Sequence, residues 1–356
     1  MRKWLTWLIP VLAFVVLDIA FVAGVSPLLA GLCAASLVGA VFAAVHHAEV
    51  VAHRVGEPFG TLILAIAVTV IETSLILSLM FAGGENAAVI PRDTIYAAVM
   101  LIFTGVVGLC LLIGGLKHRE QAFRVEGARG GLAALIVMVS LSLVLPIFTT
   151  TTTSGTYSFS QLEFVAATSL ALWGVFVFIQ TVRHRDYFLP VSDASNPDAH
   201  AKPPTKGQAR ASFGLLIVSL VTVVGLAKML SPTVERLVIQ AGAPKAVIGI
   251  VIAMLVLLPE TVAAVRAAYA NRLQTSMNLA VGSALASIGL TIPVIAMAAV
   301  VFKLPLHLGL DPKDLVMLWV TLTVTTVTLG TGRTNLMQGA VHLVLFAAFL
   351  FLAFVP

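Results

Sequence analysis

Charge is what this sequence has least of. Of its 356 residues, 21 are Lys or Arg and 16 are Asp or Glu, so 10% are charged while 59% are hydrophobic. Soluble globular proteins have about 25% charged residues, and the composition therefore excludes an ordinary soluble enzyme. Cysteine is scarce as well. Cys33 and Cys110 lie far apart in apolar runs, which excludes a disulfide framework or a cysteine metal motif and predicts two small packing side chains.

Long apolar runs are what the sequence has instead. A helix needs about 20 apolar residues to cross a bilayer, and these runs are too long for the strands of a barrel. We therefore predict an all-α polytopic membrane protein of about eleven transmembrane helices, at residues 5–23, 26–46, 59–82, 94–116, 131–148, 161–181, 211–230, 245–268, 277–301, 314–330 and 336–355.

The positive charges indicate how the chain is inserted. With the N-terminus in the cytoplasm, fifteen of the 21 Lys and Arg residues fall in cytoplasmic segments. The positive-inside rule then predicts a multi-pass protein of the inner (plasma) membrane, with its C-terminus outside. The formal charge of +5 is explained by these loops and not by nucleic-acid binding. Arg2, Lys3 and the run after them resemble a signal peptide, but Asp18 and the lack of a small-x-small cleavage site favour an uncleaved helix.

The longest polar interruption, 183–210, divides the chain into halves. We expect an extra N-terminal transmembrane helix (1–24), a first five-helix repeat (25–182), a cytoplasmic linker (183–210) and a second five-helix repeat (211–356). Five spans per half force the halves to enter the membrane in opposite directions, which is the inverted-repeat architecture of many secondary transporters. A weak internal match, 58–72 with 245–260, supports this division.

Two carboxylates lie deep in predicted spans. Glu72 comes about fourteen residues into the third span and Glu260 about sixteen into the eighth. A carboxylate at this depth costs roughly 3 kcal/mol or more and usually marks an ion path or a proton relay. Because the two spans are equivalent elements of inverted halves, we expect both carboxylates to face a shared axis. The alternative is a protonated Glu that only hydrogen-bonds a neighbouring helix.

The pair suits Ca²⁺, which takes about six to eight oxygen ligands. Burial near a like charge raises a carboxylate pKa, so a site without its cation should take up protons. Cation and protons then compete for Glu72 and Glu260, which is the simplest physical basis for antiport.

Further oxygens lie close to both carboxylates in the sequence. Thr69 and Thr73 flank Glu72, while Ser283 and Ser287 recur at four-residue spacing in the ninth span. Pro259 should loosen the helix before Glu260 and free carbonyl groups for a cation. The alternatives are helix packing by small residues for the serines and a simple kink for Pro259.

A polar cluster at the end of the second predicted span comprises His46, His47, Glu49, His53, Arg54 and Glu57, of which His47, Glu49, His53 and Glu57 are the candidate site residues. It is a candidate cytoplasmic vestibule that gathers cations or senses pH, with an ordinary polar loop as the alternative. The spacing differs from His-Glu-x-x-His, so a zinc site is disfavoured. His342 in the last span could relay protons, although a lone His is more often a satisfied interior group.

Several stretches resemble the cation/proton exchanger branch of the calcium:cation antiporter superfamily, and most closely its bacterial sodium–calcium/proton antiporters. The matching residues are 47–61, 68–72, 257–260, 271–276, 278–287 and 332–335, together with Gly339.

The resemblance implies that Glu72 and Glu260 are the two ion-binding glutamates of the repeats. It places Ser283 and Ser287 in the second helix of the second repeat, and Thr104 in the equivalent helix of the first. Thr104 stands where the family pattern has Asn, and it offers one oxygen with a shorter reach.

The implied activity is export of Ca²⁺, with Na⁺ or K⁺ as further substrates, in exchange for H⁺ by alternating access. No cofactor is expected, and the partners are small cations, protons and the bilayer, with no nucleic acid. The alternatives are a monovalent Na⁺(K⁺)/H⁺ antiporter, a passive channel and an intramembrane zinc-dependent hydrolase.

Overall fold

The computed structural model describes residues 3–56, 59–82, 87–189, 204–240, 242, 244 and 246–355. The chain divides into two compact units, of which unit 1 takes 1–90 and 201–259 and unit 2 takes 91–200 and 260–356. Each unit thus contains segments from both sides of the predicted linker. The divisions fall at Ile90–Pro91 and at Pro259–Glu260.

Unit 1 holds α1 (Lys3–Ala23), α2 (Pro27–Val55), α3 (Phe59–Ala82), α8 (Lys206–Gln240) and the first part of α9 (Ala246–Tyr269). Apart from Ile90, unit 2 holds α4 (Ile90–Met100), η1 (Leu101–Val106), α5 (Val107–His118), β1 (Glu120–Ala122), α6 (Val125–Val139), η2 (Ser140–Val144), η3 (Leu145–Ile147), α7 (Phe159–Phe178), η4 (Ile179–Arg183) and η5 (Arg185–Phe188). It continues with the end of α9, then α10 (Leu273–Gly289), α11 (Thr291–Phe302), α12 (Pro312–Leu329), β2 (Arg333–Asn335) and α13 (Leu336–Phe354).

The predicted spans are confirmed as helices that follow one another along the chain in the predicted order. Among the described residues, ten helical stretches are long and apolar enough to cross a membrane. They correspond to ten of the eleven predicted runs. The 18-residue helix α12 lies at the remaining run, 314–330. The chain is therefore an all-α polytopic membrane protein. Cys33 and Cys110 are both buried free thiols, as predicted.

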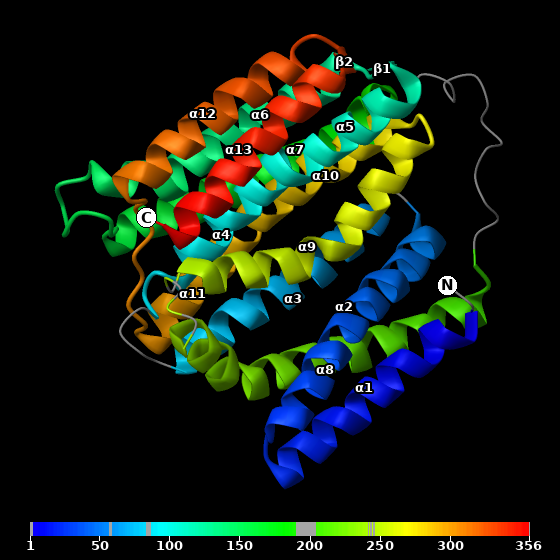
Figure 1. Cartoon of the computed structure of the whole chain (residues 1–356), viewed down its shortest axis with the longest axis vertical. Helices are drawn as coiled ribbons and strands as arrows, with labels where there is room; N and C mark the ends of the chain where they lie inside the picture. Colours follow the sequence, from blue (N-terminus) through cyan, green and yellow to red (C-terminus); the bar gives the residue numbers. More distant parts are fainter. Residues whose placement is uncertain are drawn as a thin grey trace. The chain divides into compact units, whose positions relative to one another are not determined.

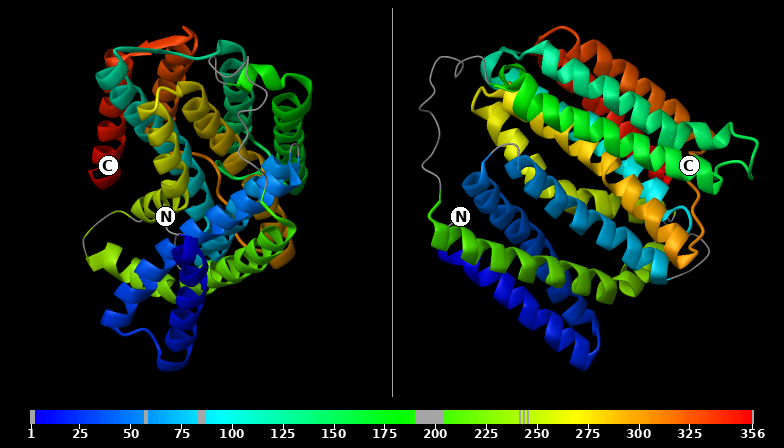
Figure 2. Two further views of the ribbon diagram at one scale, coloured as in Figure 1. Left: turned by 90° about the vertical axis from the view of Figure 1, so that its right-hand side faces the viewer. Right: turned by 180° about the vertical axis from the view of Figure 1, so that it is seen from behind.

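Unit 1 is built around α2, which packs along α8, with α1 and α3 against the same pair (Figure 2). Small residues make the close approach possible. Ala40, Ala44 and Ala48 are fully buried along α2, and a Cβ on Gly225 of α8 would lie 2.5 Å from the side chain of Leu17. Small residues at helix interfaces are the usual means of packing in lipid, where no hydrophobic effect drives helices together.

The most extensive helix contact in unit 2 is between α5 and α13. A Cβ on Gly115 would lie 2.6 Å from the backbone nitrogen of Leu336, so the two backbones nearly touch. The helix α10 packs against α6 and α7. The fully buried side chains of unit 2 include Phe103, Leu135 and Leu143.

Helix α2 extends beyond its predicted end at residue 46 and continues to Val55. The His47–His53 segment is therefore helical and not a loop. The helix begins at Ser26, whose hydroxyl accepts from the Leu29 N–H, and ends at Gly56, where φ is 79°. No Gly or Pro interrupts the stretch between residue 46 and Gly56, so nothing stops the helix earlier.

Three features of the fold were not predicted from the sequence. The π-helical turn η1 interrupts one predicted span, and the π-helical turns η2 and η4 lie at the C-terminal ends of two others. The ninth span is broken at Leu290 between α10 and α11, since Pro293 has no N–H to bond the carbonyl of Gly289. The third feature is the antiparallel pair β1–β2, which joins Gln121 to Thr334 in register (Figure 1).

Contacts between connecting segments agree with the predicted sidedness. Strand β1 pairs with β2, and both belong to segments predicted inside. Arg92 donates to Gly309 O at 2.9 Å, and the N–H of Leu308 donates to Gly155 O at 2.9 Å; these segments were predicted outside. Which of the two faces is cytoplasmic stays a prediction.

Candidate ion-binding site

Glu72 lies in unit 1, on a buried polar face of α3. Its side chain is 2% exposed, and Thr69 and Thr73 are 6% and 5% exposed. These residues occupy positions i, i+3 and i+4, so they share one face of the helix. Thr73 Oγ1 donates to Thr69 O at 2.6 Å, which uses the hydroxyl hydrogen and leaves the oxygen lone pairs. Two hydroxyl oxygens thus accompany the carboxylate on a helix that packs against α2 and α8.

Glu260 lies at the start of the unit 2 part of α9, directly after the buried Pro259. Its side chain is half-buried. Since proline has no N–H, Pro259 cannot donate to the carbonyl of Leu255, four residues earlier in the same helix. The proline therefore weakens the helix ladder in the turn before the carboxylate, as the sequence predicts.

The turn at 270–272, where Asn271 has φ 60°, joins the helices α9 and α10. Ser276 Oγ donates to Ala264 O at 2.6 Å and fixes the two helices against each other.

Ser283 of α10 is half-buried, and its hydroxyl has no hydrogen-bond partner among the described residues. Ser287, one turn further, is 3% exposed. An orphaned hydroxyl at a helix interface is uncommon, because a buried polar group without a partner costs roughly 1–3 kcal/mol. The Ser283 oxygen is accordingly available to a ligand.

Thr104 lies in the π-helical turn η1 and is fully buried. Its hydroxyl donates to Met100 O at 2.5 Å. Within unit 2, η1 packs against α10. The structure thus brings the helix of Thr104 beside the helix of Ser283 and Ser287.

The predicted vestibule residues do not share one environment. His47 is 1% exposed, and its ring contacts Thr6 O at 2.9 Å and Ser212 Oγ at 3.2 Å, which joins α1, α2 and α8. Glu49 and His53 are exposed on α2, and Glu57 lies outside the described residues. Across the described ranges, no group of three His, Cys, Asp or Glu side chains could hold a metal ion, so the zinc alternative gains no support.

An ionic group at one end of unit 2 was missed at the sequence level. The buried Arg92 bonds Asp93 at 2.8 Å and Asp311 at 3.4 Å. Lys313 bonds Asp314 at 3.4 Å. The only available signal was that all five charges lie at the ends of predicted spans, which does not reveal their pairing.

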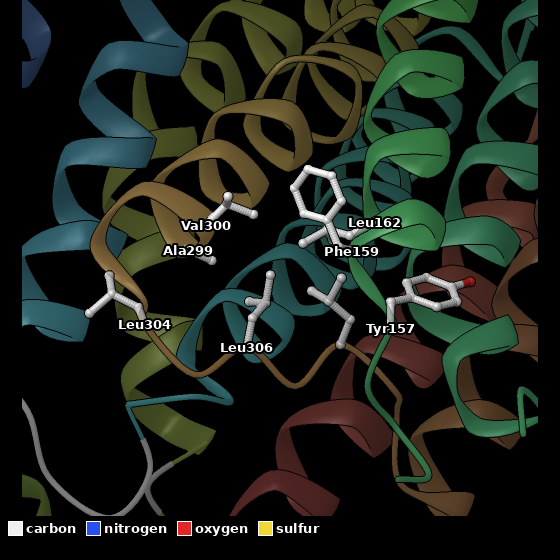
Figure 3. A pocket seen from close by; sticks show the side chains of 8 residues that line it. Tyr157, Phe159, Leu162, Ala299, Val300, Leu304 and Leu306 are labelled. Carbon is white, nitrogen blue, oxygen red and sulfur yellow. The ribbon is translucent and has the colours of Figure 1, made fainter. Parts of the chain in front are cut away.

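A cavity of about 240 Å³ lies between the end of α11 and the start of α7 (Figure 3). Apolar side chains line it, among them Phe159, Leu162, Val300 and Leu306, and the Tyr157 hydroxyl donates away to Leu141 O at 2.6 Å. Such walls offer no oxygen set for a cation. None of the predicted site residues lines this cavity.

Known proteins resemble the chain over its whole length. It is 47% identical to y4hA of Sinorhizobium fredii, named as an ionic transporter, over 99% of this chain and 96% of that protein. It is 36% identical to the sodium-potassium/proton antiporter ChaA of Escherichia coli, over 99% and 97%. A solved structure of the Ca²⁺/H⁺ antiporter protein YfkE shares the fold with a TM-score of 0.73 at 17% identity, over 99% of both chains.

The family model described as sodium/calcium exchanger protein matches residues 25–182 and 211–355. The two matched segments contain α3 with Glu72 and α9 with Glu260. On this match and the two relatives, the chain belongs to the sodium/calcium exchanger protein family.

Proposed function

We propose that this chain is a secondary antiporter that exports Ca²⁺ in exchange for H⁺ by alternating access, with cation and protons competing for Glu72 and Glu260. The observation that carries the proposal is the buried carboxylate of Glu72 with two hydroxyl oxygens on its own helix face. In a chain of the exchanger family, Glu72, Thr69 and Thr73 are candidate ligands for the transported cation.

The physical reason for coupling is the cost of a bare carboxylate inside the bilayer. An ionised Glu at this depth must be neutralised by a proton or by a cation. A site of two carboxylates that holds Ca²⁺ is electrically balanced, and a site that holds two protons is balanced as well. The protein can therefore change between its inward-open and outward-open forms with either occupant bound. It changes form more slowly when the site is empty and doubly charged.

The choice of Ca²⁺ over monovalent ions rests on oxygen number. Ca²⁺ takes six to eight oxygen ligands and favours carboxylates. The proposal assigns to it the carboxylates of Glu72 and Glu260, with the hydroxyls of Thr69, Thr73 and Ser283 as further candidate ligands. A second candidate is Na⁺(K⁺)/H⁺ exchange, which the name of the ChaA relative favours.

We place the protein in the inner (plasma) membrane with its N-terminus in the cytoplasm and its C-terminus outside, on the charge bias of the loops.

The test is exchange in sealed proteoliposomes with a pH dye inside and external pulses of Ca²⁺, Na⁺ or K⁺. Glu72→Gln and Glu260→Gln should each lower cation-driven proton movement by at least about 100-fold, because each removes a carboxylate for which the cation and the protons compete. The matched control is Glu163→Gln, the same change at an exposed carboxylate on α7, which should exchange like the wild type. Retained exchange in both site variants would overturn the proposal, and conductance without proton flux would indicate a channel.

A further inference from the structure

The helix that carries Thr104 contains a widened turn. In a regular α-helix, the Val107 N–H would donate to Phe103 O, four residues earlier. Here the Val107 N–H donates to Ile102 O, five residues earlier. In the π-helical turn η1, the Phe103 carbonyl therefore loses the Val107 N–H that an α-helix would supply. This carbonyl immediately precedes Thr104. Single π-turns of this kind are frequent at functional sites.

A side chain from a distant helix replaces that partner. His342 of α13 is fully buried, and its Nδ1 lies 2.6 Å from Phe103 O. Its Nε2 lies 3.0 Å from Thr328 Oγ1 of α12. A carbonyl oxygen only accepts, so Nδ1 must carry the hydrogen. In a neutral ring, Nε2 then accepts, and the Thr328 hydroxyl donates to it.

The close packing of α13 makes this contact possible. A Cβ on Gly108 would lie 3.1 Å from the Cβ of His342, and one on Gly105 would lie 3.3 Å from the ring of Phe346. The glycines thus allow α13 to lie close against the widened turn. All of these residues belong to unit 2.

We propose that His342 is a positioning residue, whose Nδ1–H holds the Phe103 carbonyl and so fixes the turn that presents Thr104 to the ion path. The link to transport rests on the proposed function, in which Thr104 supplies an oxygen beside α10. The ring itself need not contact the ion. Its loss should therefore weaken the apparent affinity for the cation more than it lowers the maximal exchange rate.

Three variants separate the two ring nitrogens. His342→Asn places an amide N–H near the position of Nδ1, His342→Gln places it near Nε2, and His342→Leu keeps bulk without a donor. We expect the half-saturating Ca²⁺ concentration of exchange to stay within about twofold for Asn and to rise about five- to tenfold for Gln and Leu, as one hydrogen bond implies. Equal impairment by all three variants, or a wild-type value for Leu, would overturn the proposal.

A second readout needs no transport. In ¹⁵N spectra of histidine-labelled protein, the ring signals lost in His342→Asn should be those of a neutral ring protonated on Nδ1. Protonation on Nε2 would rule out donation to Phe103 O and overturn the proposal, whether or not the protein exchanges ions. Failure of the Glu72 and Glu260 variants to affect exchange would instead overturn the proposed function, so the two failures are distinguishable.

Discussion

Several buried hydroxyl side chains of this protein donate a hydrogen bond to the backbone of the helix that carries them. Thr73, Thr104 and Thr325 each donate to the carbonyl four residues earlier. This bond satisfies the hydroxyl hydrogen without a partner from another helix. It also directs the oxygen lone pairs away from the donated hydrogen, so such a residue can pack or can bind a cation, and its neighbours decide which.

Thr73 and Thr325 are a matched pair for separating these roles. Both are buried and make the same bond, to Thr69 O at 2.6 Å and to Thr321 O at 2.7 Å, but only Thr73 adjoins Glu72. We expect Thr73→Val to raise the half-saturating Ca²⁺ concentration about fivefold, since one oxygen ligand is worth about 1 kcal/mol, and Thr325→Val to leave it unchanged. Dose–response curves of exchange decide the matter, and equal effects of the two variants would assign Thr73 to packing.

His307, in the segment before α12, gives a stability change with a definite sign. Burial lowers the pKa of His307 below its ordinary 6.5, and the positive charge of Arg92 lowers it further, against partial opposition from Asp311. As the pH falls below 6.5, the unfolded chain binds a proton that the folded protein resists. The stability contributed by the neutral ring is therefore complete above pH 6.5 and is lost as the pH falls toward the lower folded value.

Thermal unfolding in detergent checks this expectation. The melting temperature should fall between pH 7.5 and pH 5.5 by more in the wild type than in His307→Gln, which cannot titrate. His53→Gln alters an exposed histidine on α2 and should keep the wild-type difference. An identical fall in His307→Gln and the wild type would contradict the assignment.

At the scale of elements, close helix contacts depend on glycine. A Cβ on Gly339 of α13 would overlap the backbone nitrogen of Leu112 on α5, and backbone cannot move aside as a side chain can. We expect Gly339→Ala to destabilise the protein by about 1–3 kcal/mol, as overpacking does. Gly174→Ala on α7 meets no atom within 4 Å among the described residues and should be neutral or slightly stabilising, because Ala favours helix. Chemical unfolding in detergent compares the two, and equal stability would refute the close contact.

Helices that depend on composition could be predicted from the sequence, and features that depend on single hydrogen bonds could not. The eleven spans follow from hydropathy, because lipid demands a long apolar run at each crossing. Helix α2 ends at Gly56, and the break at Leu290 follows from Pro293; both are local signals that a closer reading could use. The turn η1 and the pair β1–β2 depend on a shift of one hydrogen bond and on three-residue strands, which leave no periodic pattern.

The residues of the candidate site likewise fall into those that could be predicted from the sequence and those that could not. Glu72 and Glu260 stand out in the sequence because a carboxylate within an apolar run is costly wherever the helix packs. The partners of His47 and His342 could not be predicted, since Ser212 and Phe103 lie 165 and 239 residues away along the chain. A hydrogen bond of that kind is fixed by tertiary packing, and no local pattern encodes it.

At the scale of the whole molecule, the sequence halves and the compact units are different divisions. The halves 25–182 and 211–355 are the segments that the family model matches, whereas each compact unit combines segments from both halves. Glu72 belongs to unit 1 and Glu260 to unit 2. Joint binding of one cation by both carboxylates is thus a proposal about the whole chain, and a property of the whole chain must test it.

Proton release on Ca²⁺ binding is that property. Calorimetric titration of the purified protein with Ca²⁺, in buffers of different ionisation enthalpy, counts the protons displaced per bound ion. We predict that the wild type releases at least one proton per Ca²⁺ near neutral pH and that Glu72→Gln and Glu260→Gln each release fewer. Tight Ca²⁺ binding by the wild type without proton release would contradict competition between the cation and protons for these carboxylates.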